Sequence, residues 1–294
     1  MGSALPKPEG VIGDKAFVEL GLTSWSSAIV PVVVMSANRI QCIGTAFNIS
    51  PFGVWVTAAH VMDEADALVA STPGSNVGLV WVGSGVGENV VDLLGGAIPI
   101  NFCDRRPSSD LALLRTDLRR QNGHLYPLPH LNLSARMRRV GTPIAGLGYT
   151  RFNIQSDITN SDGRRIVVEP NFHMATGEVT RLYPERRDSA MLPSACFETS
   201  ARFDGGMSGG PLICQDGWVC GVVSTGGLGS DDDGYTSFAS ATPVIFLLEL
   251  QEGAQTQSVY EMVQRGLVIA DQYFPNLEIV EQGERVGISF AIER

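Results

Sequence analysis

Long hydrophobic runs are missing from this sequence of 294 residues. The longest, at 28–35 and 244–248, are far shorter than the roughly 20 apolar residues that a membrane-spanning helix needs. Basic side chains are also scarce, because 21 Lys and Arg stand against 31 Asp and Glu, giving a net charge of -10. Contacts with phosphate backbones require the opposite balance. The sequence therefore predicts neither a membrane span nor a nucleic-acid-binding protein.

The cysteines and histidines show no pattern of a metal site. The cysteines are odd in number, and His124, His130 and His173 are scattered along the chain. Residues 1–20 have neither the basic start nor the apolar stretch of a secretory signal. We therefore expect reduced thiols, no metal, no cofactor and a cytoplasmic protein, with secretion as the alternative if a signal peptide has been removed. The cysteines are Cys42, Cys103, Cys196, Cys214 and Cys220.

Turn-forming residues are plentiful, with 33 Gly and 16 Pro, as in folds of many short strands. Apolar runs predict strands in two groups, which a polar connection at 117–122 separates. The first group is 29–35, 42–49, 54–58, 67–70, 77–82, 96–100 and 111–115, and the second is 142–148, 165–169, 173–182, 196–199, 211–214, 219–224 and 236–241. We therefore predict an all-β protein with two halves, at 15–122 and 123–250, and an extension at 251–294.

Two helices are predicted towards the C-terminus. One closes the second half at 242–250, with Thr242 as its cap and Pro243 in its first turn. In the extension, 258–265 is predicted to be helical and 277–292 to form a hairpin. Two roles for the extension stay open: a structural strap on the second half, which we favour, and a partner-binding or regulatory element.

The segment 205–211 reads Gly-Gly-Met-Ser-Gly-Gly-Pro and places Ser208 among glycines. A serine nucleophile needs an exposed hydroxyl and nearby backbone N–H groups that face the oxygen that becomes negative. Glycines permit the tight turn that brings these groups to a substrate. Taken alone, the segment is also compatible with a flexible turn.

Two further segments complete a catalytic pattern. An apolar strand ends in Ala58, Ala59 and His60, where the small residues leave the imidazole room to reach another part of the protein. Asp110 opens the apolar run 111–115, where its burial is costly unless it is hydrogen-bonded. A histidine N–H would satisfy this carboxylate and fix the tautomer that leaves the other ring nitrogen free as a base.

Together these three segments resemble the trypsin/chymotrypsin superfamily, particularly its bacterial trypsin-like peptidases, over residues 20–250. The chain order His60, Asp110, Ser208 is that of this family and differs from that of subtilisins and α/β-hydrolases. The resemblance implies two six-stranded antiparallel β-barrels of the chymotrypsin-like kind, with a C-terminal helix and a short extension. It also implies a serine endopeptidase that hydrolyses peptide bonds of a protein substrate through an acyl-enzyme intermediate.

The resemblance also assigns roles to single residues. Ser208 becomes the nucleophile, His60 the general base and acid, and Asp110 the group that orients His60. The backbone N–H groups of Gly206 and Ser208 form the oxyanion hole.

The segment 223–226 resembles the family's substrate-pairing strand. There the hydroxyl of Ser224 is expected to contact Asp110, while Thr225 and Gly226 pair with the backbone of an extended peptide. This pairing favours a peptide over the small ester that an esterase or acyl transferase with the same triad would use. A protease-like binding module without activity is the other alternative, and the complete triad counts against it.

Arg202 predicts which substrate side chain is preferred directly before the cut bond. It stands six positions before Ser208, where the trypsin branch carries an Asp that selects Arg or Lys. An Arg202 that points into the pocket would favour acidic side chains. If it turns to solvent, neutral groups such as Phe203 and Thr236 line the pocket and favour small or aliphatic side chains. Either way we expect poor cutting after Arg and Lys, unless an acid of 231–233 folds into the pocket.

Three departures from the family bear on activation and on disulfides. Met207 stands where zymogen-activated members carry an Asp that pairs with a freshly cut N-terminal amine. Val61 and Ile144 occupy the partner positions of family disulfides at Cys42 and Cys214. We therefore expect neither activation by N-terminal trimming nor a structural disulfide. Which protein is the substrate, and whether a regulatory partner must order the oxyanion loop, stay open.

Overall fold

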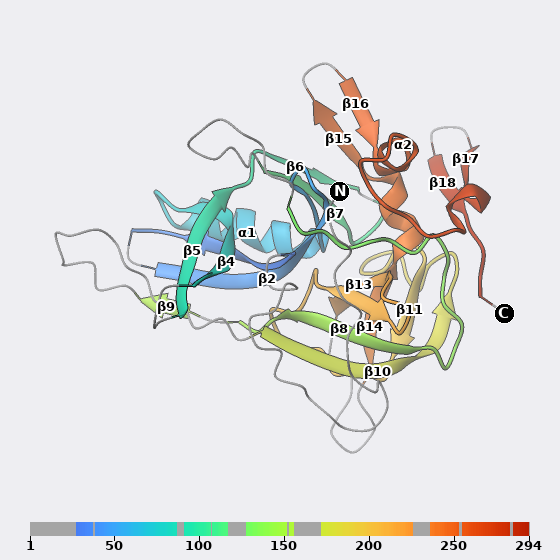
Figure 1. The fold of residues 1–294 in the computed structure, drawn as a ribbon, viewed down its shortest axis with the longest axis horizontal. Coiled ribbons are helices and arrows are strands. Elements are labelled where there is room, and N and C mark those ends of the chain that lie inside the picture. Colours follow the sequence, from blue (N-terminus) through green and yellow to red (C-terminus); the bar gives the residue numbers. More distant parts are fainter. Residues whose placement is uncertain are drawn as a thin grey trace.

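The computed structural model describes residues 28–37, 39–86, 91–106, 108–116, 128–151, 153–155, 172–225, 236–252, 255–282 and 285–293. The predicted strand at 165–169 and the candidates His124, Gly226 and 231–233 lie outside these ranges. Strands dominate the described chain and form two main bodies, which lie against each other (Figure 1).

The first body is an antiparallel sheet built almost wholly from the first half of the chain. Its strands are β1 (Ile29–Met35), β2 (Arg39–Ser50), β3 (Val54–Thr57), β4 (Asn76–Val86), β5 (Val91–Pro99), β6 (Phe102–Arg105), β7 (Ala112–Arg115) and β9 (Asn153–Gln155). They follow the order β5-β4-β1-β2-β3-β7-β6, and β9 pairs with β2. Because β9 comes from the second half of the chain, one short segment of that half joins the first sheet.

The second body is a closed barrel with the order β10-β11-β14-β13-β12-β8. Its strands are β8 (Pro143–Tyr149), β10 (Phe172–Tyr183), β11 (Cys196–Thr199), β12 (Pro211–Cys214), β13 (Val219–Thr225) and β14 (Ser237–Ala241). The predicted all-β fold of two chymotrypsin-like barrels is confirmed, with the first sheet open between β5 and β6 in the part of the chain that is described.

The strand β1 is buried on both sides of the first sheet, to which its side chains point alternately. Val30 and Val32 of β1 belong to an apolar cluster that also holds side chains of the helix α1. Ile29 and Val33 of the same strand belong to a larger cluster that extends through the second barrel. This two-sided burial explains why β1 is continuously apolar in sequence and shows no alternation with polar residues.

The helix α1 (Ala59–Ser71) follows β3 directly. The prediction of a strand at 67–70 is therefore wrong, since these residues form the end of α1. A four-residue apolar run does not distinguish a strand from a helix by periodicity. The helix buries Val61, Met62 and Ala65, which lie on one of its faces and pack on the first sheet.

The segment that closes the second barrel differs from its prediction in type and length. It is the 3₁₀ helix η1 (Thr242–Leu247), and the chain then enters the strand β15 (Glu249–Glu252), which pairs with β16 (Gln255–Ser258). Pro243 lies in the first turn as predicted, but Thr242 is no cap. Its hydroxyl donates to the carbonyl of Val219 at 3.1 Å and so ties the helix to β13.

The other two elements predicted in the extension are confirmed. They are the helix α2 (Val259–Gln264), which begins with a capping box of Ser258 and Glu261, and a hairpin of β17 (Glu278–Gln282) and β18 (Arg285–Ser289). A short 3₁₀ helix, η2 (Phe274–Asn276), lies between them.

The extension is anchored to the second half of the molecule. The carboxylate of Asp271 accepts from the hydroxyl of Ser134 at 2.8 Å and from the N–H of Ala135 at 3.1 Å. Further along, Phe274 packs its ring on Phe246 of η1, with ring centres 5.5 Å apart. These contacts give the extension a fixed place beside the barrels.

Candidate active site

His60 and Asp110 meet at one end of the first sheet. The antiparallel pairing of β3 with β7 sets Thr57 opposite Ala112, so the chain just after β3 and the chain just before β7 lie at the same edge. Asp110 is on the second of these segments, and His60 is the second residue of α1 on the first. Local strand pairing therefore brings together two residues that are 50 positions apart.

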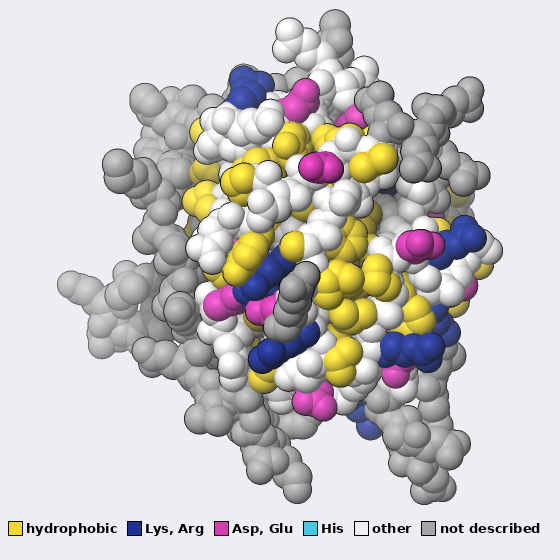
Figure 2. Space-filling view, turned by 90° about the vertical axis from the view of Figure 1, so that its right-hand side faces the viewer, with side chains coloured by type: hydrophobic (Ala, Val, Ile, Leu, Met, Phe, Trp, Pro, Cys, Tyr) yellow, Lys and Arg dark blue, Asp and Glu magenta, His cyan; other side chains and the backbone are white. Residues whose placement is uncertain are grey.

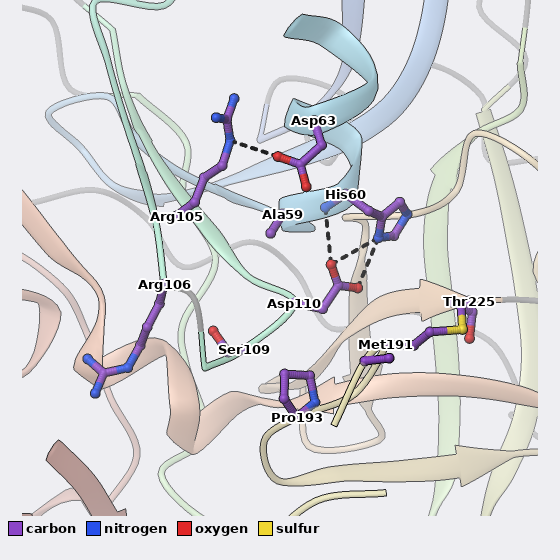
Figure 3. Close-up of a pocket in the computed structure, with 11 residues that line it drawn as sticks. Ala59, His60, Asp63, Arg105, Arg106, Ser109, Asp110, Met191, Pro193 and Thr225 are labelled. Atoms are coloured by element: carbon purple, nitrogen blue, oxygen red, sulfur yellow. Dashed lines mark hydrogen bonds and ion pairs between the residues drawn. The ribbon is translucent and has the colours of Figure 1, made fainter. Parts of the chain in front are cut away.

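The carboxylate of Asp110 is buried and fully engaged. Nδ1 of His60 lies 2.9 Å from Oδ2 and 3.0 Å from Oδ1, and the backbone N–H of His60 donates to Oδ1 at 3.1 Å (Figure 3). The hydroxyl of Ser224 donates to Oδ2 from the second barrel. These donors compensate for the burial of the charge and place the imidazole proton on Nδ1, which leaves Nε2 as the acceptor.

Ser208 is held by backbone contacts to both barrels. Its carbonyl accepts from the N–H of Thr45 in β2 at 2.8 Å, and the N–H of Gly209 donates to Val223 in β13 at 2.7 Å. Its hydroxyl donates to the backbone carbonyl of Ser224 at 3.1 Å. Within the described residues no hydrogen bond joins this hydroxyl to His60, and the link between Ser208 and Asp110 runs through Ser224, which contacts both.

The pKa of His60 is raised above its ordinary value. Burial of the ring opposes the charged form, but the hydrogen bond and the charge of Asp110 outweigh it, and the charges of Glu64 and Asp63 add to the effect. All three acids raise the pKa of His60, because a nearby negative charge favours the imidazolium. The site is thus suited to accept a proton on His60.

The peptide planes around Gly206 and Ser208 are fixed by hydrogen bonds of the preceding carbonyls. The carbonyl of Gly205 accepts from the N–H of Arg151 at 2.8 Å, and that of Met207 accepts from Gly210 at 2.9 Å. In a trans peptide the N–H points away from the preceding C=O. The N–H groups of Gly206 and Ser208 thus face away from these partners, and neither has an acceptor within the described chain.

Only glycine fits at position 206. Its φ is +99°, and a Cβ there would lie 2.6 Å from the nitrogen of Arg151 and 2.7 Å from the carbonyl of Tyr149. Its own carbonyl accepts from the hydroxyl of Thr45 at 2.8 Å, and the same hydroxyl accepts from the N–H of Tyr149 at 2.9 Å. Thr45 was not predicted, because no local pattern in β2 shows that it contacts a residue 161 positions away.

A cavity of about 550 Å³ opens beside the His–Asp pair. Figure 3 shows that its walls come from the start of α1, the segment before β7, a loop of the second barrel and the end of β13. The lining residues are Ala59, His60, Asp63, Arg105, Arg106, Ser109, Asp110, Ala190, Met191, Pro193 and Thr225. Of the predicted substrate-binding residues, Thr225 therefore lies in the cavity next to His60.

The other predicted substrate-binding residues are placed differently. The side chain of Arg202 is 61% exposed and lies 3.7 Å from the carboxylate of Asp204. Phe203 is buried, and its ring fills the space that a side chain at Gly146 would need. Ser224 contacts Asp110 as predicted.

The described residues contain no group of three His, Cys, Asp or Glu side chains that could hold a metal ion. His130 is buried with Nδ1 3.1 Å from the carbonyl of Leu128, and His173 is exposed. Among the helices that the structure describes, none is long and apolar enough to cross a membrane. The five cysteines are free thiols.

Comparison with known proteins gives one decisive match. A model of the trypsin-like peptidase domain matches residues 44–222, which is more than half of the chain. No curated protein matches the sequence.

Several solved structures are similar to this chain. The active form of the Rv3671c protease from M. tuberculosis is 22% identical with a TM-score of 0.46, over 74% of this chain and 77% of that one. Deg5 is 19% identical with a TM-score of 0.49, over 75% of this chain and 86% of that one. The MamO protease domain from Magnetospirillum magneticum is 16% identical with a TM-score of 0.48, over 76% of this chain and 95% of that one.

Proposed function

We propose, since the chain belongs to the trypsin-like peptidase family, that this serine endopeptidase works through a triad of His60, Asp110 and Ser208. The observation that carries the proposal is the Asp110 carboxylate, which binds Nδ1 of His60 at 2.9 Å and accepts from Ser224. This arrangement leaves Nε2 of His60 directed to take a proton. A structural histidine needs no such support from two barrels.

The reaction begins when the hydroxyl of Ser208 exchanges its bond to the carbonyl of Ser224 for one to Nε2 of His60. The exchange trades one hydrogen bond for another, so its cost is on the order of 1 kcal/mol or less. Oγ then attacks the carbonyl carbon of the substrate while its proton moves to Nε2. The imidazolium that forms is stabilised by Asp110, whose pairing already raises the pKa of His60.

The negative oxygen of the tetrahedral intermediate binds the N–H groups of Gly206 and Ser208. Donors that are fixed before the reaction stabilise the transition state without reorganisation. Collapse of the intermediate breaks the C–N bond, and the leaving amine takes the proton from His60. Water, deprotonated by His60, then hydrolyses the ester on Ser208 and restores the hydroxyl.

For specificity we propose a neutral pocket that accepts small or aliphatic side chains before the cut bond. Arg202 is mostly exposed and pairs with Asp204, so its charge is screened by solvent. The buried Phe203 occupies the neighbouring position with an apolar ring.

A fluorophosphonate probe tests the proposal, because it reacts with a serine only when a base and an oxyanion site activate it. We expect labelling of Ser208, located by peptide mapping, together with cleavage of an unbiased peptide library. Folded protein that shows neither labelling nor cleavage would contradict the proposal. Hydrolysis of p-nitrophenyl esters without any peptide cleavage would instead identify an esterase.

A further inference from the structure

We propose that the C-terminal extension forms a second part of the substrate groove, in which it holds an apolar side chain of the peptide. The occupant is the part of the substrate that continues beyond Thr225, in extended conformation. This inference rests on the proposed peptidase function. It gives the extension a role in binding in addition to its packing on the barrels.

The cavity beside the His–Asp pair adjoins a second cavity of about 880 Å³. The two share Arg105, Arg106 and Pro193 in their linings, so one surface runs from His60 to the extension. The second cavity is lined by Asp104, Arg105, Arg106, Ser108, Arg186, Ser189, Pro193, Leu247, Glu249, Val280, Val286, Gly287, Ile288 and Ser289. Four consecutive residues of β18 thus form one wall.

Arg106 connects the wall formed by β18 to the chain segment that carries Asp110. It stands four positions before Asp110, and its guanidinium donates to the carbonyl of Val286 at 2.6 Å and to that of Leu247 at 2.8 Å. Its Nε donates to the hydroxyl of Ser108 at 3.1 Å. The hairpin of β17 and β18 is therefore held at a set distance from the catalytic Asp, as a wall of the groove must be.

The chain beyond β18 holds the wall from its other side. The N–H of Glu293 donates to the carbonyl of Met137 at 2.9 Å, and Met137 in turn donates to Ala291 at 3.0 Å. Ile288 and Phe290 pack against the large core cluster. A wall anchored at both ends loses little entropy when a peptide binds.

The groove offers an exposed apolar contact among polar side chains. Its lining holds eight charged or serine residues together with Pro193, Leu247, Val280, Val286 and Ile288, and Val286 is 41% exposed and so available to a ligand. Of the charged residues, Arg105 pairs with Asp66 at 2.7 Å, and Arg106 binds backbone carbonyls. Figure 2, which views the side of the molecule where β17 and β18 lie in Figure 1, shows hydrophobic side chains between arginines and acids.

The remaining charges select weakly between acidic and basic substrates. Arg186 and Glu249 are both exposed in the lining and have opposite signs. The carboxylate of Asp104 accepts from the N–H of Glu249 at 3.2 Å. Because these charges offset one another, we assign the binding contribution of the groove to burial of an apolar side chain against Val286.

The edge of β18 suits an extended peptide. The carbonyl of Val286 points to Arg106 and therefore away from β17. In an antiparallel pair the backbone groups of alternate residues face the same way, so the N–H and C=O of Ile288 also face away from β17. They can pair with a substrate strand, as exposed strand edges do in peptide recognition.

The test compares short and long peptides that share one cut site. Cleavage of denatured β-casein first supplies the preferred site, and an octapeptide around it is the short probe. Longer probes extend it at either end by two, four or six Ser and Gly residues, with one Leu at the last position. We expect kcat/KM to rise about tenfold when an extension at one end reaches the groove, mainly through a lower KM.

Two variants of the same hairpin then locate the effect. Val286→Asp places a charge in the groove and should reduce the ratio of kcat/KM for the long over the short probe to about one. Ile279→Asp makes the matched change on a side chain that is 40% exposed, as against 41% for Val286, and is not part of the lining. It should leave the ratio as in the parent protein, and thermal unfolding checks that both variants are folded.

The inference fails if no extension at either end raises kcat/KM, or if the rise survives Val286→Asp. It also fails if Ile279→Asp abolishes the rise equally. Loss of the proposed function looks different, because then Ser208 does not react with the fluorophosphonate probe and peptides of no length are cut.

Discussion

The hydroxyl of Ser208 donates to the backbone carbonyl of Ser224 at 3.1 Å, while the hydroxyl of Ser224 donates to Asp110. One residue of β13 therefore contacts the nucleophile through its backbone and the carboxylate through its side chain. Ser224 connects the two barrels at the point where the proposed triad would assemble. Its contacts hold Ser208 of one barrel close to Asp110 of the other.

Ser208→Ala and His60→Ala should each lower kcat/KM by roughly four to six orders of magnitude, because members of a triad act as a unit. Neither change disturbs the core, since Ser208 loses one hydrogen bond and His60 is 41% exposed. Peptide cleavage and thermal unfolding measure the two effects. Ser36→Ala, which alters a serine in the hairpin between β1 and β2, serves as the control and should retain full activity.

Thr45 should act as a positioning residue for the oxyanion site. Thr45→Val removes the donor to the carbonyl of Gly206 and the acceptor for the N–H of Tyr149. We expect kcat to fall roughly 10- to 100-fold with little change in KM, because the donor peptide loses its fixed orientation. Stability should fall by about 1–3 kcal/mol, since two buried groups lose their partner. Steady-state kinetics and denaturant unfolding separate the two effects.

Two further variants decide whether Thr45 has more than a structural role. Thr45→Ser keeps the hydroxyl and should restore kcat. Thr57→Val removes another buried threonine hydroxyl, which donates to the carbonyl of Thr45 at 2.7 Å, and should cost stability with kcat retained. An equal loss of kcat in Thr57→Val would show that the effect is general weakening of the fold.

The acid side of the pH profile should respond to Glu64. Activity requires neutral His60, so kcat/KM falls as the pH drops through its raised pKa. Glu64→Gln removes a charge that raises this pKa, and the acid limb should move to lower pH. Asp66→Asn, on the same helix, removes a charge that pairs with Arg105 at 2.7 Å and is not among the causes of the raised pKa of His60, so this variant should leave the limb in place. A limb that shifts equally in both variants would argue against this account.

The thiols should be slow to react in the folded protein. Burial raises the pKa of Cys103 and of Cys196 to about 11, and Cys42, Cys214 and Cys220 are buried. Because the thiolate is the reactive form, iodoacetamide at neutral pH should modify native protein slowly and all five cysteines rapidly after denaturation. Intact mass with and without reductant should agree. Two or more bridges in native protein would overturn the expectation of reduced thiols and of a cytoplasmic location.

His60, Asp110 and Ser208 could be proposed from sequence because each stands next to a predicted strand or in a glycine-rich turn, where a local pattern marks it. Thr45 and Arg106 could not, because their partners lie 161 and 180 positions away and only the packed structure brings them together. The helix α1 was missed for another reason. Its apolar segment at 67–70 is too short for periodicity to separate helix from strand, and burial against the first sheet decides between them.

Specificity before the cut bond gives the last prediction, and it depends on where the charge of Arg202 lies. The side chain is 61% exposed and 3.7 Å from Asp204, so we expect solvent to screen the charge and acidic substrates to gain no preference from it. Peptides that differ only at this position should be cut best with Ala, Val or Leu, and at least about tenfold worse with Arg or Lys.

Arg202→Ala should change these preferences by less than about threefold, because the removed charge is exposed and screened. A strong preference for Asp or Glu that disappears in Arg202→Ala would show that the guanidinium enters the pocket during binding. A strong preference for Arg or Lys that disappears when Asp231, Asp232 and Asp233 are changed to Asn would show that an acid from this segment supplies the specificity. A preference for small and aliphatic side chains that survives both changes assigns the selection to neutral walls around the buried Phe203.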